Sequence, residues 1–312
     1  LLYGISLLYG ATGSTLLPTI IAEIQQNGSA NPLVIVGIAL VVVAMSFKIA
    51  IVPFHMWTPD VYTGAPTPVT GFLSGAAKAA GFAVFVRVLM TGIPLEGANW
   101  GNLLWLLAVL TMTVGNVMAL RQNEVKRMLA YSSIAHAGYV LVAIVVGSTS
   151  AISGVIFYSC AYAFMGTGAF GILTIRDAGR IPRTFDDLAG YGKRNPTLAL
   201  LMSLFIFSLV GLPLTGGFIG KFQIFNAALQ DGWIWLTLIG ILNSALSVYY
   251  YLRVVMLMYM REGALPEGTV ISNSISVFAL TGLLGTALAV LYLGVFPDHI
   301  LDLASLSILA LL

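Results

Sequence analysis

The chain has 312 residues, of which 59% are hydrophobic and only 8% are charged, against about 25% charged residues in a typical soluble domain. Fourteen basic and twelve acidic residues leave a net charge of +2, which excludes the strongly basic surface of a nucleic-acid-binding protein. The single cysteine, Cys160, excludes an internal disulfide and a four-cysteine iron–sulfur or zinc site built by this chain alone. This composition predicts a membrane protein.

Stretches of about 20 mostly apolar residues predict membrane-spanning helices. We find one truncated candidate, which comes first, and eight complete ones, so the expected fold class is all-α and polytopic. In chain order they are Leu1–Thr12, Pro32–Met56, Thr67–Thr91, Leu103–Leu120, Met128–Gly147, Ala151–Ile175, Thr197–Leu229, Trp233–Met260 and Ile275–Phe296. We interpret residues 1–312 as one membrane domain. Because Leu1 stands inside an apolar run, we expect N-terminal helices to be missing.

Two of the candidate spans contain residues that break helices. Thr197–Leu229 is too long for one straight span and contains Gly211, Pro213, Gly216, Gly217 and Gly220. Pro32–Met56 carries Pro53 shortly after Lys48. Interrupted helices are tolerated at membrane depth only where protein or a water-filled path satisfies the freed backbone groups. The pattern therefore predicts two discontinuous helices and favours a transport function.

The basic residues between the spans predict the orientation. Lysine and arginine occur only in every second connection, as the positive-inside rule requires. The residues that define the inner side are Arg121, Lys126, Arg127, Arg176, Arg180, Arg183, Lys193, Arg194 and Arg261. This alternation predicts that the C-terminus lies on the outer side of the membrane.

Three lysines lie inside apolar stretches: Lys48, Lys78 and Lys221. Lys78 stands near the middle of its span, where a charge costs at least about 2.5–3.5 kcal/mol on insertion scales. Snorkelling to the interface is the alternative for a lysine near a span end. Because desolvation lowers the pKa of a lysine by up to about 3–5 units, a buried lysine can hold or release a proton near neutral pH. We favour a proton relay.

His136 lies near the middle of its span, with Ser132 and Ser133 four and three residues before it on the same helical face. It is either a hydrogen-bonded packing histidine or a relay station between lysines, because imidazole titrates near neutrality. No G-x-G-x-x-G motif occurs, so there is no fingerprint for NADH binding. We expect no redox chemistry, cofactor site or metal site in this chain.

Three separated motifs carry a family resemblance: FKIAIVPFHMWTPDVYTGAPTPVTGFLSGAAKAAGF, RQNEVKRMLAYSSIAHAGY and FSLVGLPLTGGFIGKF. In order and spacing they resemble the antiporter-like membrane subunits of proton-translocating NADH–quinone oxidoreductase, respiratory complex I. WTPDVYTGAPTPVT, with a lysine eight residues past its end, is more similar to the subunit N group than to its sister subunits. The resemblance covers essentially the whole chain.

The resemblance implies a fold of two inverted repeats, each with a broken helix, and a role for each candidate residue. Lys48 is similar to the family's lysine that pairs with a glutamate on an earlier helix, which would precede this chain. Lys78 is similar to the next relay lysine, His136 to the central histidine, and Lys221 to the lysine of the second broken helix. Protons would pass from the inside along this axis and leave outside.

The resemblance also implies partners and a location. The chain would be a multi-pass subunit of a translocase in the inner (plasma) membrane, beside other antiporter-like and small membrane subunits. NADH, FMN, iron–sulfur clusters and quinone would be bound by partner subunits, and quinone reduction there would drive the transport. One alternative is a subunit of a cation/proton antiporter or membrane-bound hydrogenase that uses the same relay without NADH. A purely structural helical bundle is the other.

Overall fold

The computed structural model describes residues 1–27, 31–92, 100–177, 184–262 and 275–309, and these residues form helices and connecting turns only. The α-helices are α1 Leu2–Thr12, α2 Leu17–Asn27, α3 Pro32–Ile49, α4 Trp57–Gly64, α5 Thr67–Phe72, α6 Lys78–Gly92, α7 Trp100–Leu120, α8 Val125–Val146, α9 Thr149–Asp177, α10 Tyr191–Arg194, α11 Pro196–Val210, α12 Gly216–Gln230, α13 Ile234–Met260, α14 Val277–Val295 and α15 Asp298–Leu309. A π-helical turn, η1 Leu73–Ala77, joins α5 to α6, and a 3₁₀ turn, η2 Phe185–Leu188, precedes α10.

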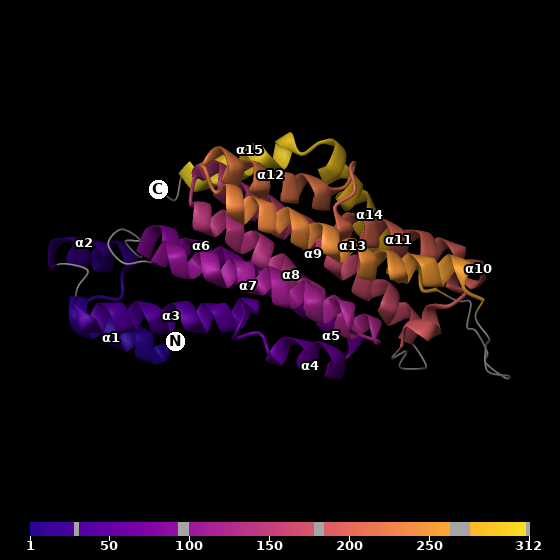
Figure 1. Ribbon diagram of the computed structural model, residues 1–312, viewed down its shortest axis with the longest axis horizontal. Helices are drawn as coiled ribbons and strands as arrows, with labels where there is room; N and C mark the ends of the chain where they lie inside the picture. Colours follow the sequence, from indigo (N-terminus) through magenta and orange to yellow (C-terminus); the bar gives the residue numbers. More distant parts are fainter. Residues whose placement is uncertain (28–30, 93–99, 178–183, 263–274, 310–312) are drawn as a thin grey trace.

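Seven helices within the described ranges are long and apolar enough to cross a membrane, or eight if α1 and α2, bent by 54°, count as one broken span. The long helices run roughly along the long axis of Figure 1. The all-α polytopic fold predicted from the sequence is therefore confirmed. Five predicted spans correspond to the single helices α7, α8, α9, α13 and α14, and Thr67–Thr91 corresponds to α5, η1 and α6 together.

Both predicted discontinuities are present. α3 ends at Ile49, Ala50 takes a left-handed conformation (φ 63°), and α4 begins only at Trp57. The region predicted as one candidate, Thr197–Leu229, forms two helices of 15 residues each, α11 and α12. The turn between them contains Gly211 at φ +89°, a conformation that glycine adopts without a steric penalty.

Helix α8 is the centre of the bundle. Its sequence is apolar on all sides, which is typical of a helix that packs against protein all round, and 89% of its spanning window is buried. It packs against α4, α7, α9, α12 and α13. The approach to α7 is close because Gly115 faces the backbone of Ala135: a Cβ atom on Gly115 would lie 2.6 Å from the Ala135 nitrogen.

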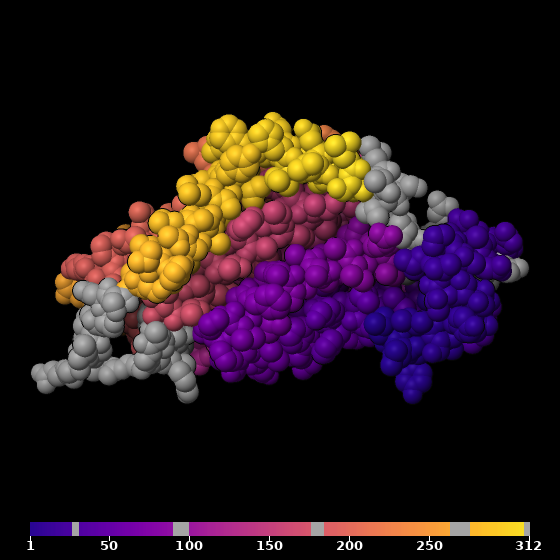
Figure 2. Space-filling view, turned by 180° about the vertical axis from the view of Figure 1, so that it is seen from behind, coloured from indigo at the N-terminus to yellow at the C-terminus, as the bar shows by residue number. Residues whose placement is uncertain are grey.

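The described connections that carry the basic residues meet at one end of the bundle, on the right in Figure 1. There, Arg261 pairs with Asp186 at 2.6 Å, and the Gly190 amide donates to the Leu257 carbonyl oxygen at 3.2 Å. This clustering agrees with the alternation of charge in the sequence. Figure 2 shows the last two helices, α14 and α15, lying across the face seen from behind, and α15 packs on α9.

Candidate functional site

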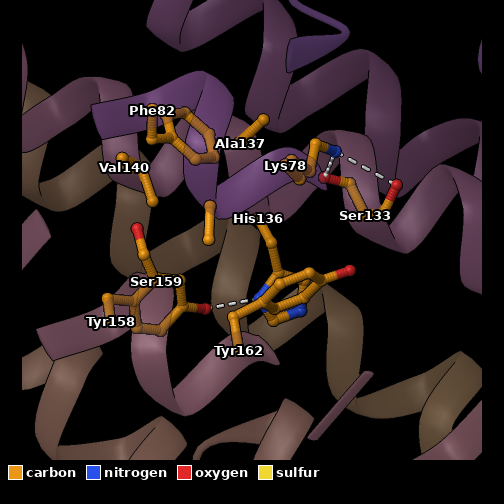
Figure 3. Close-up of a pocket in the computed structure, with 10 residues that line it drawn as sticks. Lys78, Phe82, Ser133, His136, Ala137, Val140, Tyr158, Ser159 and Tyr162 are labelled. Atoms are coloured by element: carbon orange, nitrogen blue, oxygen red, sulfur yellow. Dashed lines mark hydrogen bonds between the residues drawn. The ribbon is translucent and has the colours of Figure 1, made fainter. Parts of the chain in front are cut away.

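Lys78 is the first residue of α6 and follows the π-helical turn η1 directly. Its side chain is only 4% exposed, although it carries an amine in the middle of an apolar span. The Nζ atom donates to the carbonyl oxygen of Ser133 at 2.5 Å and lies 3.2 Å from the Ser133 hydroxyl, as the dashed lines in Figure 3 show. Single π-turns inside membrane helices are frequent at functional sites. Here the residue directly after the π-turn is the one that reaches α8.

His136 lies one helical turn beyond Ser133 on α8 and is 2% exposed. Its Nδ1 atom is hydrogen-bonded to the hydroxyl of Tyr158 on α9, and its Nε2 atom lies 2.9 Å from the hydroxyl of Tyr251 on α13. The Tyr158 ring lies beside the imidazole and nearly parallel to it, with the ring centres 5.9 Å apart (Figure 3). Both ring nitrogens are thus bound to hydroxyl groups, which can donate or accept a proton as the imidazole requires.

Lys221 lies on α12, just past the turn that ends α11, and is 5% exposed. Its Nζ atom donates to the carbonyl oxygens of Leu209 and Val210 at 3.0 and 2.8 Å and to the hydroxyl of Ser244 at 3.0 Å. It also lies 5.0 Å from the centre of the Tyr139 ring. The carbonyl groups at a helix C-terminus and the face of an aromatic ring are both favourable contacts for a cation.

Neither Lys78 nor Lys221 has a carboxylate partner among the residues that the structure describes. The ion pairs in those residues include Arg127–Asp60, Lys193–Glu262 and Arg261–Asp186, each with an exposed carboxylate. A buried cation without an anion is costly, and it persists where hydrogen bonds or a function compensate. The described residues also contain no group of three or more His, Cys, Asp and Glu side chains that could hold a metal ion.

Lys48 is exposed among the described residues, whereas its position in an apolar stretch predicts a lysine inside the protein. It lies in the last turn of α3, and the described helices leave its side chain exposed. It nevertheless lines a cavity of about 20 Å³ together with Thr58, Tyr62 and Lys78. A space of this size holds about one water molecule. Lys48 and Lys78 are therefore brought to one cavity, and Lys48 reaches it from the surface of the described chain.

A second cavity of about 10 Å³ lies between Lys78 and His136 and is also lined by Tyr158, Ser159 and Tyr162 (Figure 3). The structure thus brings Lys78, His136 and Lys221 into one buried polar region on α6, α8 and α12. Sequence reasoning missed the hydroxyl partners Tyr158, Ser244 and Tyr251. Their occurrence inside apolar spans was a visible signal, but tyrosine and serine are too common in membrane helices to be selected without contacts.

The fold and this site define a multi-pass α-helical membrane protein with protonatable side chains aligned inside the bundle, next to two broken helices. Residues 1–247 match the family described as "NADH:quinone oxidoreductase/Mrp antiporter, TM". The chain belongs to this family of membrane subunits.

Individual relatives agree with the family match. The chain is 48% identical to NADH-quinone oxidoreductase subunit N of Trichlorobacter lovleyi, over 99% of this chain and 63% of the relative. Among solved structures, it is similar to a chain of respiratory complex I from Thermus thermophilus with bound aureothin (36% identity, TM-score 0.79, 96% of this chain and 64% of that one). It is also similar to a chain of the archaeal membrane-bound sulfane sulfur reductase (28% identity, TM-score 0.86, 97% of this chain and 61% of that one). The chain spans about three fifths of the length of such relatives.

Proposed function

We propose that this chain is a membrane-arm subunit of the subunit N type in an NADH–quinone oxidoreductase, and that it translocates protons through Lys48, Lys78, His136 and Lys221. The observation that carries the proposal is the placement of His136 on the most buried helix, near two buried lysines that lack carboxylate partners among the described residues. The name and the identity of the Trichlorobacter relative support the subunit type.

The contacts of the two lysines suggest different tasks. Lys221 places its amine on three acceptors and an aromatic face, which suits a station that holds a proton. Within the described residues, the Lys78 amine has two hydrogen bonds, both with Ser133, and the cavities on its two sides lead towards Lys48 and His136. Lys78 is therefore suited to exchange a proton. A change of one charge about 6 Å away, at an effective dielectric of about 20, alters such an equilibrium by roughly 2.8 kcal/mol.

The remaining parts of the proposal concern the assembly. NADH, FMN, the iron–sulfur clusters and quinone are bound by partner subunits, and quinone reduction there drives the relay through electrostatic and conformational coupling. The partners are other antiporter-like and small membrane subunits. The complex lies in the plasma membrane, with the basic end of this chain inside and its C-terminus outside.

A second candidate is a subunit of a complex that uses the same relay without NADH, such as a cation/proton antiporter or a membrane-bound hydrogenase. The similarity to the archaeal sulfane sulfur reductase favours it, because that protein is a respiratory membrane complex with a different reductase activity. The two candidates share the relay and differ in the redox partner.

The first experiment is a gentle affinity purification of the full-length protein from its native membrane. We expect NADH–quinone reductase activity that is sensitive to complex I inhibitors to purify with it. An intact multi-subunit assembly without that activity would favour the second candidate.

The second experiment tests the relay by measuring NADH-driven proton uptake in everted membrane vesicles. We expect Lys78→Met to abolish this uptake, because methionine fills the buried site but carries no proton. The matched control is Lys193→Met, which removes an exposed lysine at the basic end and should leave uptake unchanged. Full proton uptake by an assembled complex that carries Lys78→Met would refute the relay.

A further inference from the structure

A buried amide, Asn116 on α7, is the centre of a polar cluster that the proposed relay does not use. Its side chain is fully buried. The Nδ2 atom donates to the Met112 carbonyl oxygen at 2.9 Å and to the Tyr139 hydroxyl at 3.1 Å, and the Oδ1 atom accepts from the Tyr250 hydroxyl at 2.8 Å. Because a carbonyl oxygen can only accept, the group that faces Met112 must be the NH₂ group. The orientation of the amide is thereby determined.

The two sides of Asn116 lead to the two ends of the relay. On one side, Tyr250 packs against Tyr251 with the ring centres 4.5 Å apart, and the Tyr251 hydroxyl lies 2.9 Å from Nε2 of His136. On the other side, Lys221 lies 5.0 Å from the centre of the Tyr139 ring and donates to the hydroxyl of Ser244. A row of neighbouring polar groups therefore extends from His136 to Lys221, with the amide in its middle, hydrogen-bonded to Tyr250 and to Tyr139.

The hydroxyl groups and the amide differ in what they can do with a proton. A hydroxyl accepts a proton on one lone pair while it releases its own, so tyrosine and serine can pass protons along this row. The NH₂ group of an amide is a donor only. A proton that reaches Tyr139 from Lys221 therefore meets a nitrogen that does not accept it, and a proton from the His136 side stops at the Asn116 oxygen.

We propose that Asn116 insulates Lys221 from His136: it binds the hydroxyl groups on both sides and interrupts proton transfer between them. This inference rests on the proposed function, in which both residues carry protons. Proton transfer between His136 and Lys221 then uses the other side of the imidazole. There, the Tyr158 hydroxyl is hydrogen-bonded to Nδ1, and Tyr158 packs against Gly220, the residue before Lys221. A permanently connected row would let the two stations exchange protons at all times and would uncouple transport from the driving reaction.

The test replaces the amide by a group of the same size that can pass a proton. In Asn116→Asp, a protonated carboxyl group takes the place of the amide: its carbonyl oxygen accepts a proton from Tyr250 while its hydroxyl oxygen releases one to Tyr139, so the interruption is removed and the group stays neutral. We expect a loss in the number of protons translocated per NADH oxidised by the intact complex. The measurement combines proton uptake with NADH oxidation in the same everted vesicles.

Two variants make the test specific. Asn243→Asp places a carboxyl group one hydrogen bond away, because Asn243 Oδ1 lies 3.3 Å from Asn116 Nδ2, but it does not join the two sides of the row. Asn116→Leu keeps the shape of asparagine and still insulates. We expect both to keep the proton yield per NADH. If Asn116→Leu fails to assemble, the comparison between the two aspartate variants remains decisive.

Three outcomes would overturn the inference that Asn116 insulates Lys221 from His136. A full proton yield with Asn116→Asp overturns the inference, and so does an equal loss with Asn243→Asp, which would assign the effect to the added carboxyl group alone. Loss of transport in an assembled complex with Asn116→Leu also overturns it, because the amide would then be part of the conducting path. The proposed function is tested separately by Lys221→Met, and unchanged proton transport with this variant would refute it.

Discussion

Replacing Lys221 by arginine separates the need for a positive charge at this position from the need for a releasable proton. The lysine amine has three acceptors at 2.8–3.0 Å and lies 5.0 Å from the Tyr139 ring centre. A guanidinium group keeps the charge, supplies enough donors and stacks well on aromatic faces. We therefore expect Lys221→Arg to preserve folding and assembly. Lys221→Met, by contrast, leaves three acceptors without their donor, at about 1–3 kcal/mol for each buried group.

The expected effect of Lys221→Arg on transport is large. At the same site, the pKa of arginine lies at least about 2 units above that of lysine, so removing its proton costs roughly 2.7 kcal/mol more. A transport cycle that requires this proton to leave would slow by about 10²-fold or more. Transport should therefore be lost although the charge and the fold are retained.

The assay is NADH-driven proton uptake in everted vesicles, with the amount of assembled complex measured on native gels. Uptake at the wild-type rate with Lys221→Arg would refute the reasoning, because the residue would then act only as a fixed charge. Loss of assembly with Lys221→Arg would show that the site recognises the shape of lysine.

Two further predictions concern stability and are measured by thermal unfolding of the purified protein in detergent. Gly217→Ala should destabilise the broken helix by about 1–3 kcal/mol, because the added Cβ atom would lie 1.9 Å from the Ser208 carbonyl oxygen. Gly282→Ala is its matched control, since nothing lies within 4 Å of the added atom, and an equal loss there would contradict the steric explanation. Asp60→Asn removes the ion pair with Arg127, in which the charged atoms lie 2.8 Å apart. The Asp60 carboxylate is 73% exposed. Such a pair contributes about 0–1 kcal/mol, so a loss well above that range would show a further role for Asp60.

The positions of the spans and of their breaks could be predicted from the sequence because both depend on local composition. A run of about 20 apolar residues is long enough to cross the bilayer whatever surrounds it. Gly211 and Pro53 interrupt helices through their own backbone chemistry, and both stand in the observed breaks. For the same reason, Lys78, His136 and Lys221 were recognisable as candidates: ionisable residues are rare inside such runs.

The partners of these residues were not predictable, because they come from distant parts of the chain. Ser133 is 55 residues from Lys78, and the hydrogen bond between Asn116 and Tyr250 joins residues 134 apart. The exposure of Lys48 was also missed, since the sequence shows only that its neighbours are apolar and not which helices cover them.

By itself, then, the sequence determined that this is a polytopic membrane protein with interrupted helices and with titratable groups at membrane depth. Only the tertiary structure decided which hydroxyl, carbonyl or amide group faces each of these titratable groups. The physical reason is that the hydrophobic effect acts on the composition of a segment, whereas a hydrogen bond depends on the positions of two atoms that only the packing of helices brings together.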